Sequence, residues 1–140
     1  METQNEKCVM VINEALPLGL IANTAAVMGI TLGKMYPQAV GEDVTDQSGC
    51  RHLGIITFPV PVLKGTAQGI RDLRERLSEP EFAGLTVVDF SDLAQSCKTY
   101  GEFMEKMAGT PESSLCYFGV AMCGDKKKID RLTGSMPLLR

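Results

Sequence analysis

Short apolar runs alternate with helical segments along the chain, and this alternation limits the fold more than any other feature of the sequence. The runs are mostly rich in β-branched residues, as is typical of strands buried in a sheet. The predicted strands are residues 8–12, 53–58, 85–90 and 115–122, and the predicted helices are residues 20–34, 66–77, a segment within 92–107, and 125–132. This order predicts an α/β fold in which helices cover both faces of a largely parallel sheet, within one domain of residues 1–140.

The first predicted helix differs from the second in how its apolar residues are distributed. Residues 20–34 are apolar all round, so this helix is expected to be mostly buried, against the sheet on one side and a partner subunit on the other. The helix of residues 66–77 has Ile70, Leu73 and Leu77 on one face and charged residues on the opposite face. The first helix therefore predicts a homo-oligomer, either a dimer or a larger assembly.

The composition is that of a folded domain without a basic surface. A chain of 140 residues with 44% apolar residues can bury a core, and its net charge of −3 provides no overall excess for holding RNA. Residues 1–7 are polar, and no apolar run approaches about 20 residues, so neither a signal peptide nor a membrane span is predicted. We expect a cytoplasmic protein that does not associate with membranes.

The five cysteines and the single histidine form no metal or disulfide signature. The number of cysteines is odd and no two are spaced as Cys-x-x-Cys, so no disulfide framework, metal site or cofactor is indicated. Cys8, Cys116 and Cys123 are expected to behave as small apolar residues in or beside strands. Cys50 and Cys97 lie in polar segments and are the better candidates for a reactive thiol.

The C-terminal part of the chain resembles a known family. The apolar strand of residues 118–122, the segment Lys-Ile-Asp-Arg-Leu-Thr-Gly at residues 128–134 and the Leu-Leu pair at 138–139 resemble the end of the type 2 peptidyl-tRNA hydrolases. The segment Gly-Leu-Thr-Val at residues 84–87, followed by Asp92, is similar to a second segment of that family.

A closer resemblance is to an uncharacterised bacterial family, domain of unknown function 2000, which is similar in fold to those hydrolases. This resemblance rests on Asn-Thr-Ala-Ala at residues 23–26, the turn at residues 43–49 and Pro-Val-Pro-Val-Leu at residues 59–63. It implies a three-layer α/β/α fold of the peptidyl-tRNA hydrolase type 2 kind, with a four-stranded mixed sheet in which one strand is antiparallel.

The segment before the first helix departs from the hydrolases. Where the hydrolases carry several lysines, residues 17–24 read Pro-Leu-Gly-Leu-Ile-Ala-Asn-Thr, and no histidine follows on the helix. Those lysines would contact tRNA phosphates and polarise the ester, and both tasks need a fixed positive charge. The sequence therefore predicts the architecture of the hydrolases without their basic residues at this place.

Three polar residues are predicted to line a cleft at the carboxyl ends of the strands, where ligands bind in open α/β sheets. Asn23 and Thr24 lie near the start of the first helix, and Asp92 follows the third predicted strand. If the protein is a hydrolase, Asp92 would orient a water or a substrate amine and Thr24 would polarise a carbonyl group. In the structural alternative, Asn23 and Thr24 bond to backbone and Asp92 caps the next helix.

Two further polar features have a structural and a functional interpretation. His52 has no identifiable nucleophile beside it, so packing in a turn is favoured over catalysis. The basic run Lys126-Lys127-Lys128 is typical of a solvated helix face, and its functional alternative is contact with phosphate.

Two main hypotheses follow from the sequence. The first is a cytoplasmic module or accessory protein that binds an unidentified small ligand at Asn23, Thr24 and Asp92. The second is a divergent hydrolase acting on an ester or amide such as peptidyl-tRNA, with Asp92 and Thr24 as catalytic residues. Nucleic-acid binding through Lys126, Lys127 and Lys128 is a weaker third alternative.

Overall fold

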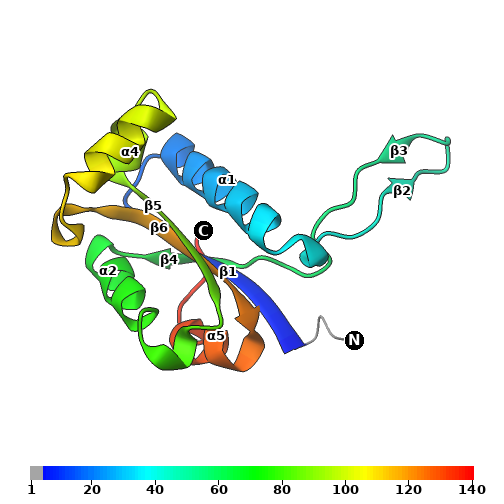
Figure 1. Ribbon diagram of the computed structural model, residues 1–140. Helices are drawn as coiled ribbons and strands as arrows, with labels where there is room; N and C mark the ends of the chain where they lie inside the picture. Colours follow the sequence, from blue (N-terminus) through cyan, green and yellow to red (C-terminus); the bar gives the residue numbers. More distant parts are fainter. Residues whose placement is uncertain (1–4) are drawn as a thin grey trace.

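The computed structural model, which describes residues 5–140, contains a four-stranded mixed sheet with helices on both faces (Figure 1). The strands stand in the order β4-β1-β6-β5. Their bounds are Glu6–Asn13 for β1, Val62–Gly65 for β4, Thr86–Ser91 for β5 and Tyr117–Asp125 for β6. The predicted α/β fold with a four-stranded mixed sheet is confirmed.

The strand directions differ from the largely parallel sheet that the order of elements predicted. β1 and β4 are parallel, but β6 is antiparallel to both β1 and β5. β6 begins beside the end of β5, where Ser91 pairs with Tyr117, so the connection between them returns the chain to the same end of the sheet. A central strand is apolar in either direction, and its composition therefore could not reveal this reversal. The single antiparallel strand agrees with what the family resemblance implied.

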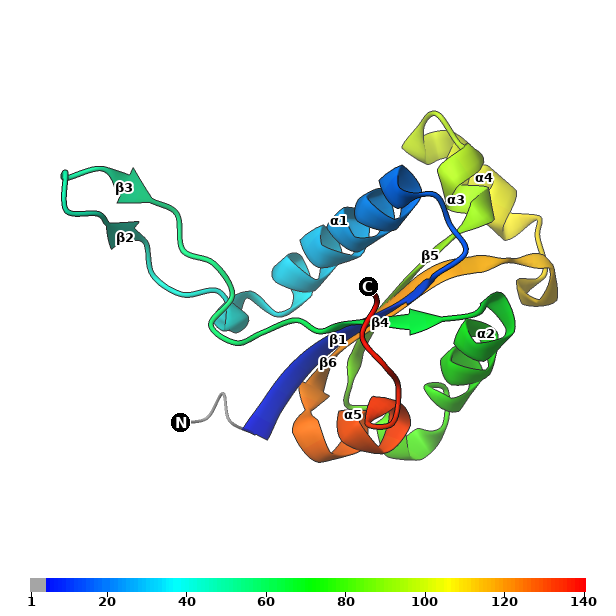
Figure 2. The ribbon, with the colours of Figure 1, turned by 180° about the vertical axis from the view of Figure 1, so that it is seen from behind.

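The helices form two layers on opposite faces of the sheet (Figures 1 and 2). On one face, α2 and α5 pack over Val9 and Val11 of β1, and on the other face α1 packs over Met10 and Ile12. Side chains that alternate along a strand point to opposite faces, so β1 contributes to both halves of the core. The helices are α1 (Leu18–Met35), α2 (Ala67–Arg76), α3 (Asp92–Ser96), α4 (Tyr100–Ala108) and α5 (Lys126–Thr133), with 3₁₀ turns at Pro37–Ala39, Pro80–Phe82 and Glu112–Ser114.

Side-chain caps fix the starts of α2, α3, α4 and α5, whereas α1 follows Pro17 without one. The Thr66 hydroxyl accepts a bond of 3.0 Å from the Gly69 amide at α2, and the Asp125 carboxylate accepts one of 3.1 Å from the Lys128 amide at α5. The predicted segment 92–107 is two helices, because the chain breaks after Ser96 and Thr99 caps α4. In the C-terminal tail, Met136 and Leu139 pack against the core, while Leu138 forms a backbone bridge to Leu63 and stays 45% exposed.

The sequence predicted that α1 would be mostly buried on all sides, but within one chain it is buried on one side only. Its inner residues Thr24, Met28 and Leu32 are buried, but Ile30 remains 76% exposed on the outer face. By length and composition α1 is apolar enough to cross a membrane, and in this fold it packs one face on the sheet with only 17% of its residues buried. The outer face of α1 is therefore apolar and uncovered within one chain.

The prediction of a strand at residues 53–58 is wrong. These residues return along an arm, residues 40–57, that projects from the domain and ends in the two-residue strands β2 (Val44–Thr45) and β3 (Arg51–His52) (Figure 2). The second strand of the main sheet is instead β4, which begins after Pro61 rather than ending before it. Isoleucines made the segment resemble a buried strand, but Leu53 and Ile55 are 78% and 79% exposed.

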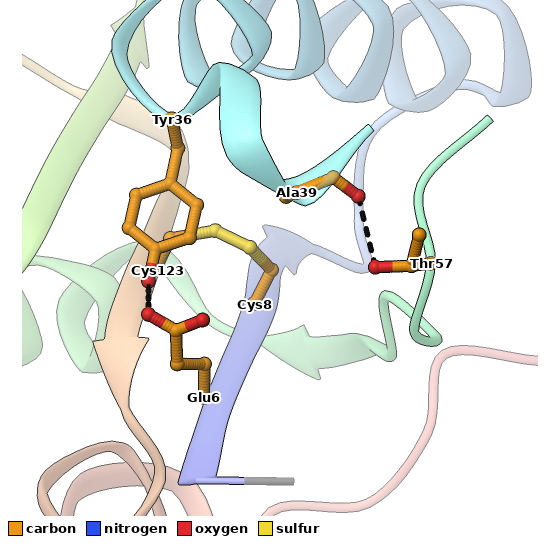
Figure 3. Close-up of a disulfide and its surroundings, with 6 residues drawn as sticks. All are labelled: Glu6, Cys8, Tyr36, Ala39, Thr57 and Cys123. Atoms are coloured by element: carbon orange, nitrogen blue, oxygen red, sulfur yellow. Dashed lines mark hydrogen bonds between the residues drawn. A yellow bond between two sulfur atoms is a disulfide. The ribbon is translucent and has the colours of Figure 1, made fainter. Parts of the chain in front are cut away.

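Two of the cysteines form a disulfide, which corrects the prediction that none would be present. Cys8 of β1 and Cys123 of β6 lie directly opposite one another in neighbouring strands, and the bond joins them on the face that α1 covers (Figure 3). The pairing could not be read from the sequence, because 115 residues separate the two cysteines. Cys116 is exposed just before β6, so it is not the core residue that was predicted, whereas Cys50 and Cys97 are free as expected.

Candidate functional site

The structure places the three predicted site residues around the junction of α1 and α3. Asn23 on α1 donates a hydrogen bond of 3.2 Å from its side-chain amide to the side-chain oxygen of Gln95 on α3. Asp92 is the first residue of the same short helix. Asn23 and Asp92 are both exposed near the carboxyl end of β5, but they do not line the cleft between α1 and α4, and Thr24 is buried.

Thr24 has no solvent-accessible surface and faces the sheet beneath α1. A Cβ atom added to Gly119 of β6 would lie 2.9 Å from the Thr24 methyl group, so the helix and strand approach closely here because Gly119 has no side chain. The Thr24 hydroxyl has no hydrogen-bond partner among the residues that the structure describes. A substrate would reach this hydroxyl only if α1 moved away from the sheet.

Asp92 ties α3 to the beginning of β6. Its carboxylate accepts bonds of 2.8 Å from its neighbour Leu93 and 3.0 Å from the Cys116 amide, and its own amide donates to the Cys116 carbonyl at 2.9 Å. The cap of α3 is Ser91, whose hydroxyl accepts from the Ala94 amide. The carboxylate oxygen Oδ2 makes none of these bonds and is the atom that a ligand could contact.

A cleft of about 520 Å³ lies one turn along α1 from Asn23, on the side of α3 and α4. Its apolar walls come from α1, the free edge of β5 and α4, and its polar groups come from α1, from Asp89 of β5, which pairs with Arg74 of α2, and from the segment between α3 and α4. The apolar walls include Val27, Val88, Phe90, Tyr100 and Phe103, and the polar groups include Thr31, Cys97, Lys98 and Thr99.

The segment that forms one rim of this cleft is fixed by a reciprocal cap. The Thr99 hydroxyl accepts a bond of 3.1 Å from the Glu102 amide, while the Glu102 carboxylate accepts one of 2.8 Å from the Lys98 amide. The Lys98 backbone bond, followed by the hydrogen bond to Lys106, lowers the pKa of Glu102. The Lys98 side chain forms no ion pair within residues 5–140, so its charge is free to meet an anion.

A second hollow, of about 190 Å³, lies between the second half of α1, the disulfide and the root of the arm. Its walls are apolar, and the hydroxyl of its one aromatic residue, Tyr36, donates to the Glu6 carboxylate (Figure 3). Burial, followed by this hydrogen bond and the charge of Glu6, raises the pKa of Tyr36 to about 12. The hollow therefore offers no free polar group to orient a small ligand.

A family model for proteins of unknown function, DUF2000, matches residues 6–140. The chain belongs to the DUF2000 family. A solved structure of a protein of unknown function from Agrobacterium tumefaciens strain C58 is similar, with a TM-score of 0.85 and 16% identity over 96% of this chain and 97% of that one. At this identity the likeness shows a shared fold alone. No curated protein matches the chain significantly.

One basic residue of this DUF2000 chain, which lies outside residues 17–24, stands near the carboxyl end of β1, where the sequence predicted the site. Lys64 of β4 stands opposite Ile12 of β1, on the face that Val62 and α1 share, because side chains alternate along β4. Lys64 is half-buried and forms no ion pair among the described residues. Lys64 was not predicted as a site residue, because only the parallel pairing of β1 and β4 brings it to this place.

The remaining polar residues have structural partners or lie on solvated surfaces. His52 bonds to Asp46 at 2.8 Å in the tip of the arm, which is the turn-packing role that was predicted, and this bond is the main reason that the pKa of Asp46 is lowered. Lys126 pairs with Asp130 at 2.6 Å, whereas Lys127 is exposed on α5. Among residues 5–140 no three histidine, cysteine or acidic side chains are grouped to hold a metal ion.

Sequence reasoning also missed the residues that line the cleft between α1 and α4. The helix within residues 92–107 was expected to start after Thr99 or earlier, without a break, but Lys98 and Thr99 form the break between α3 and α4. The signal that could have found this break is the spacing of Thr99 and Glu102, because Thr-x-x-Glu is a common helix start.

Proposed function

We propose that this protein is a small-ligand binding or accessory module whose site is the cleft between α1, the edge of β5 and α4. The ligand class is a molecule with an aromatic or apolar body and one anionic group. The body would lie against Tyr100 and Phe103, and the anion would face Lys98. The proposal includes a fold of the peptidyl-tRNA hydrolase type 2 kind, a cytoplasmic location and self-association.

The mixed lining of the cleft carries this proposal. Binding sites for small molecules are typically hollows of about 300–1,000 Å³ with mostly apolar walls and a few polar groups that fix orientation. The cleft of about 520 Å³ has this size, and its cation, Lys98, lies on the rim formed by residues 97–99, with Thr31 and Asp89 elsewhere in the lining. Asn23 lies one helical turn before Val27 of the cleft lining and Asp92 two residues before Ala94, but neither of them lines the cleft itself.

The proposal is tested with 1-anilinonaphthalene-8-sulfonate, an aromatic fluorescent probe that carries a single anionic group. We expect Lys98→Met and Phe103→Ala each to weaken probe binding about tenfold. The first substitution removes the cation that would face the sulfonate, and the second removes an aromatic wall that would contact the rings. Lys106→Met removes a cation of α4 that lies outside the cleft lining and should leave binding unchanged.

A second variant separates this cleft from the apolar hollow at the disulfide. Gly33 lines that hollow, and a Cβ atom added to it meets nothing within 4 Å. Gly33→Leu should therefore fill the hollow and leave probe binding in the cleft intact. Loss of probe binding in Gly33→Leu, with normal binding in Lys98→Met, would show that the cleft is not the site.

The rival function is a divergent hydrolase, and Lys64 is the observation that favours it. A cation near the end of β1 would supply part of the charge that residues 17–24 lack, and Asp92 would orient the water or amine. The assay is cleavage of an N-blocked aminoacyl-tRNA. The binding-module proposal expects no turnover, whereas turnover that is lost in both Asp92→Asn and Lys64→Met would replace it with the hydrolase.

Binding to tRNA without cleavage is the third outcome of the same experiment. Phosphate contacts are strongest at low salt, so a titration at low ionic strength is the most sensitive measurement. Binding that is lost when Lys126, Lys127 and Lys128 are replaced together by methionine would assign the basic run to nucleic acid. The proposal expects no binding, because Lys126 is paired with Asp130 and the net charge of the chain is −3.

A further inference from the structure

The outer face of α1 lacks the charged residues that a solvated helix carries. Lys34 is the single charged residue in the 18 residues of α1, whereas Leu18 and Ile30 are 82% and 76% exposed. In α2 the outward positions are charged, as is usual for a helix that packs one face on a sheet. Exposed apolar surface of this extent marks a place where another molecule binds.

The arm of residues 40–57 is a second apolar feature that its own chain does not cover. It extends away from the domain in both views of the fold (Figures 1 and 2). Its exposed apolar side chains are Val40, Val44, Leu53 and Ile55. The pattern of residues 53–58 is that of a buried strand, so these side chains match an environment that a single copy does not provide.

Backbone contacts hold the arm in an extended shape. A Cβ atom on Gly54 would lie 1.9 Å from the Gly41 carbonyl oxygen, so the two halves of the arm touch where only glycine fits. The Gly54 amide donates to Asp43 at 3.0 Å. At the tip, Asp46 accepts bonds from the amides of Ser48 and Cys50. An arm ordered in this way loses little conformational freedom when it binds a partner.

The apolar hollow lies at the root of the same arm. It is bounded by Gly29 and Gly33 of α1, by Val40 and Ile56 of the arm root and by the disulfide. Because it has no free polar group, it suits an aliphatic side chain better than a polar metabolite. An arm and a hollow on one chain form a self-complementary pair, as a two-fold symmetric interface requires.

We propose that two copies of this chain associate through exchanged arms, with Leu53 or Ile55 of each arm entering the apolar hollow beside α1 of the other copy. The exposed outer residues of α1 flank this contact. The proposal deepens the self-association that forms part of the proposed function, and it does not depend on the ligand cleft. Its failure would therefore leave the binding test with the fluorescent probe unaffected.

Charge favours a second copy over a membrane as the occupant. The arm carries Glu42, Asp43 and Asp46 against one arginine, Arg51, so it would be repelled by an anionic lipid surface. On the second copy, Lys34 follows Gly33 at the hollow and offers the opposite charge to the acidic arm. Electrostatic complementarity of this kind fixes the orientation of an interface.

Sedimentation equilibrium of the full chain tests the proposal. We expect the wild type to form a dimer with a dissociation constant below about 10 µM, and Ile55→Glu to weaken association at least about tenfold, because it would bury a charge in the hollow. Met104→Glu is the matched control, since Met104 is an exposed apolar residue on α4 outside the arm and the hollow, and it should leave the dimer intact.

Gly33→Leu separates loss of association from loss of folding. Leucine in place of glycine raises helix propensity and fills the hollow from within, so this variant should be a stable monomer. A dimer of unchanged affinity in Gly33→Leu and Ile55→Glu would overturn the arm exchange. A wild type that remains monomeric at about 100 µM would also overturn it, and binding of that monomer to vesicles of phosphatidylcholine and phosphatidylglycerol would identify a membrane as the occupant instead.

Discussion

The two faces of the sheet are covered by helices of different character. α2 and α5 bury Ile70, Leu73, Ile129 and Leu132, and they turn charged residues to the outside. α1 buries Thr24, Met28 and Leu32 but keeps apolar residues on its outer side as well. The α2–α5 face therefore presents charged residues to solvent, whereas the α1 face leaves apolar residues exposed in a single chain, which is the difference on which the proposed dimer rests.

The same asymmetry appears in how each face is tied to the sheet. On the α2–α5 face, Lys7 of β1 pairs with Asp130 at 2.7 Å and Arg74 of α2 pairs with Asp89 of β5 at 3.1 Å. On the α1 face, the hydroxyl of Tyr36 at the end of α1 donates to Glu6 of β1, whereas the Thr24 hydroxyl has no partner among residues 5–140. The disulfide on this face joins β1 to β6 within the sheet. Substitutions on the two faces should therefore change different properties.

Removal of the disulfide should have the largest effect on stability. The bond closes a loop across 115 residues, and losing a native disulfide typically costs about 2–5 kcal/mol. We expect the double variant Cys8→Ala/Cys123→Ala to lose about 2–4 kcal/mol of unfolding free energy in urea. The wild type should lose a similar amount in a strong reductant, and the variant should not respond to the reductant.

An unchanged wild-type unfolding curve in reductant would show that the disulfide does not stabilise the α1 face. Thiol counting in freshly lysed cells extends this measurement to the protein's compartment. The expected cytoplasm keeps most thiols reduced, so an oxidised Cys8–Cys123 pair there would point to an oxidising location instead.

Charge on the outer surface should affect association on the α1 face alone. Ile30→Lys on α1 should weaken the dimer about tenfold, or about 1.4 kcal/mol, because the exposed apolar side chain flanks the proposed contact. Glu75→Lys on α2 is the matched change on the other face, where the residue is exposed among charged neighbours. Equal effects of the two substitutions in sedimentation would contradict the difference between the faces.

The Thr24 hydroxyl, which has no hydrogen-bond partner in the described residues 5–140, allows a stabilising substitution. A buried polar group without a partner costs free energy, so Thr24→Val should raise the unfolding free energy by about 1 kcal/mol in urea denaturation. The substitution also removes the group that a hydrolase mechanism would use. A variant that is less stable than the wild type would mean that the hydroxyl has a partner in solution.

The smallest expected effect is a loss of stability at low pH, which the ion pairs of Asp130 on the α2–α5 face should cause. Hydrogen bonds from Lys126 and then Lys7 lower the pKa of Asp130 in the folded chain below its usual value of 3.8. The stabilisation is therefore present above that pH and is lost as the pH falls toward the folded value. For a partly exposed pair we expect a few tenths of a kcal/mol, measured as a flatter acid limb in Asp130→Asn.

Much of the fold was predictable because local patterns decide it. The charged outer face of α2 and the caps Asp125 and Thr99 follow from nearby residues alone. The direction of β6 and the Cys8–Cys123 pairing depend on contacts between distant segments, so no local pattern contains them. Residues 53–58 were misassigned because they have the composition of a core strand although Leu53 and Ile55 are exposed.

The candidate site was predictable only in part. Asn23 and Asp92 were expected at a cleft, and the structure places both beside α3 on the exposed surface. Lys98 and Lys64 reach the neighbouring surfaces through a helix break and a strand pairing, respectively. The catalytic and ligand-binding roles given to Asn23, Thr24 and Asp92 stay predictions that the binding and cleavage assays address.

A photo-cross-link from the arm is the most direct test of whether the α1 face is covered by a second copy. The photoreactive residue p-benzoylphenylalanine replaces Leu53, and unlabelled chain is mixed with chain labelled with ¹⁵N before irradiation. The account predicts mixed-isotope cross-links between the arm of one copy and residues 29–40 of the other. Cross-links confined to a single chain, or none at concentrations where the protein is a dimer, would contradict it.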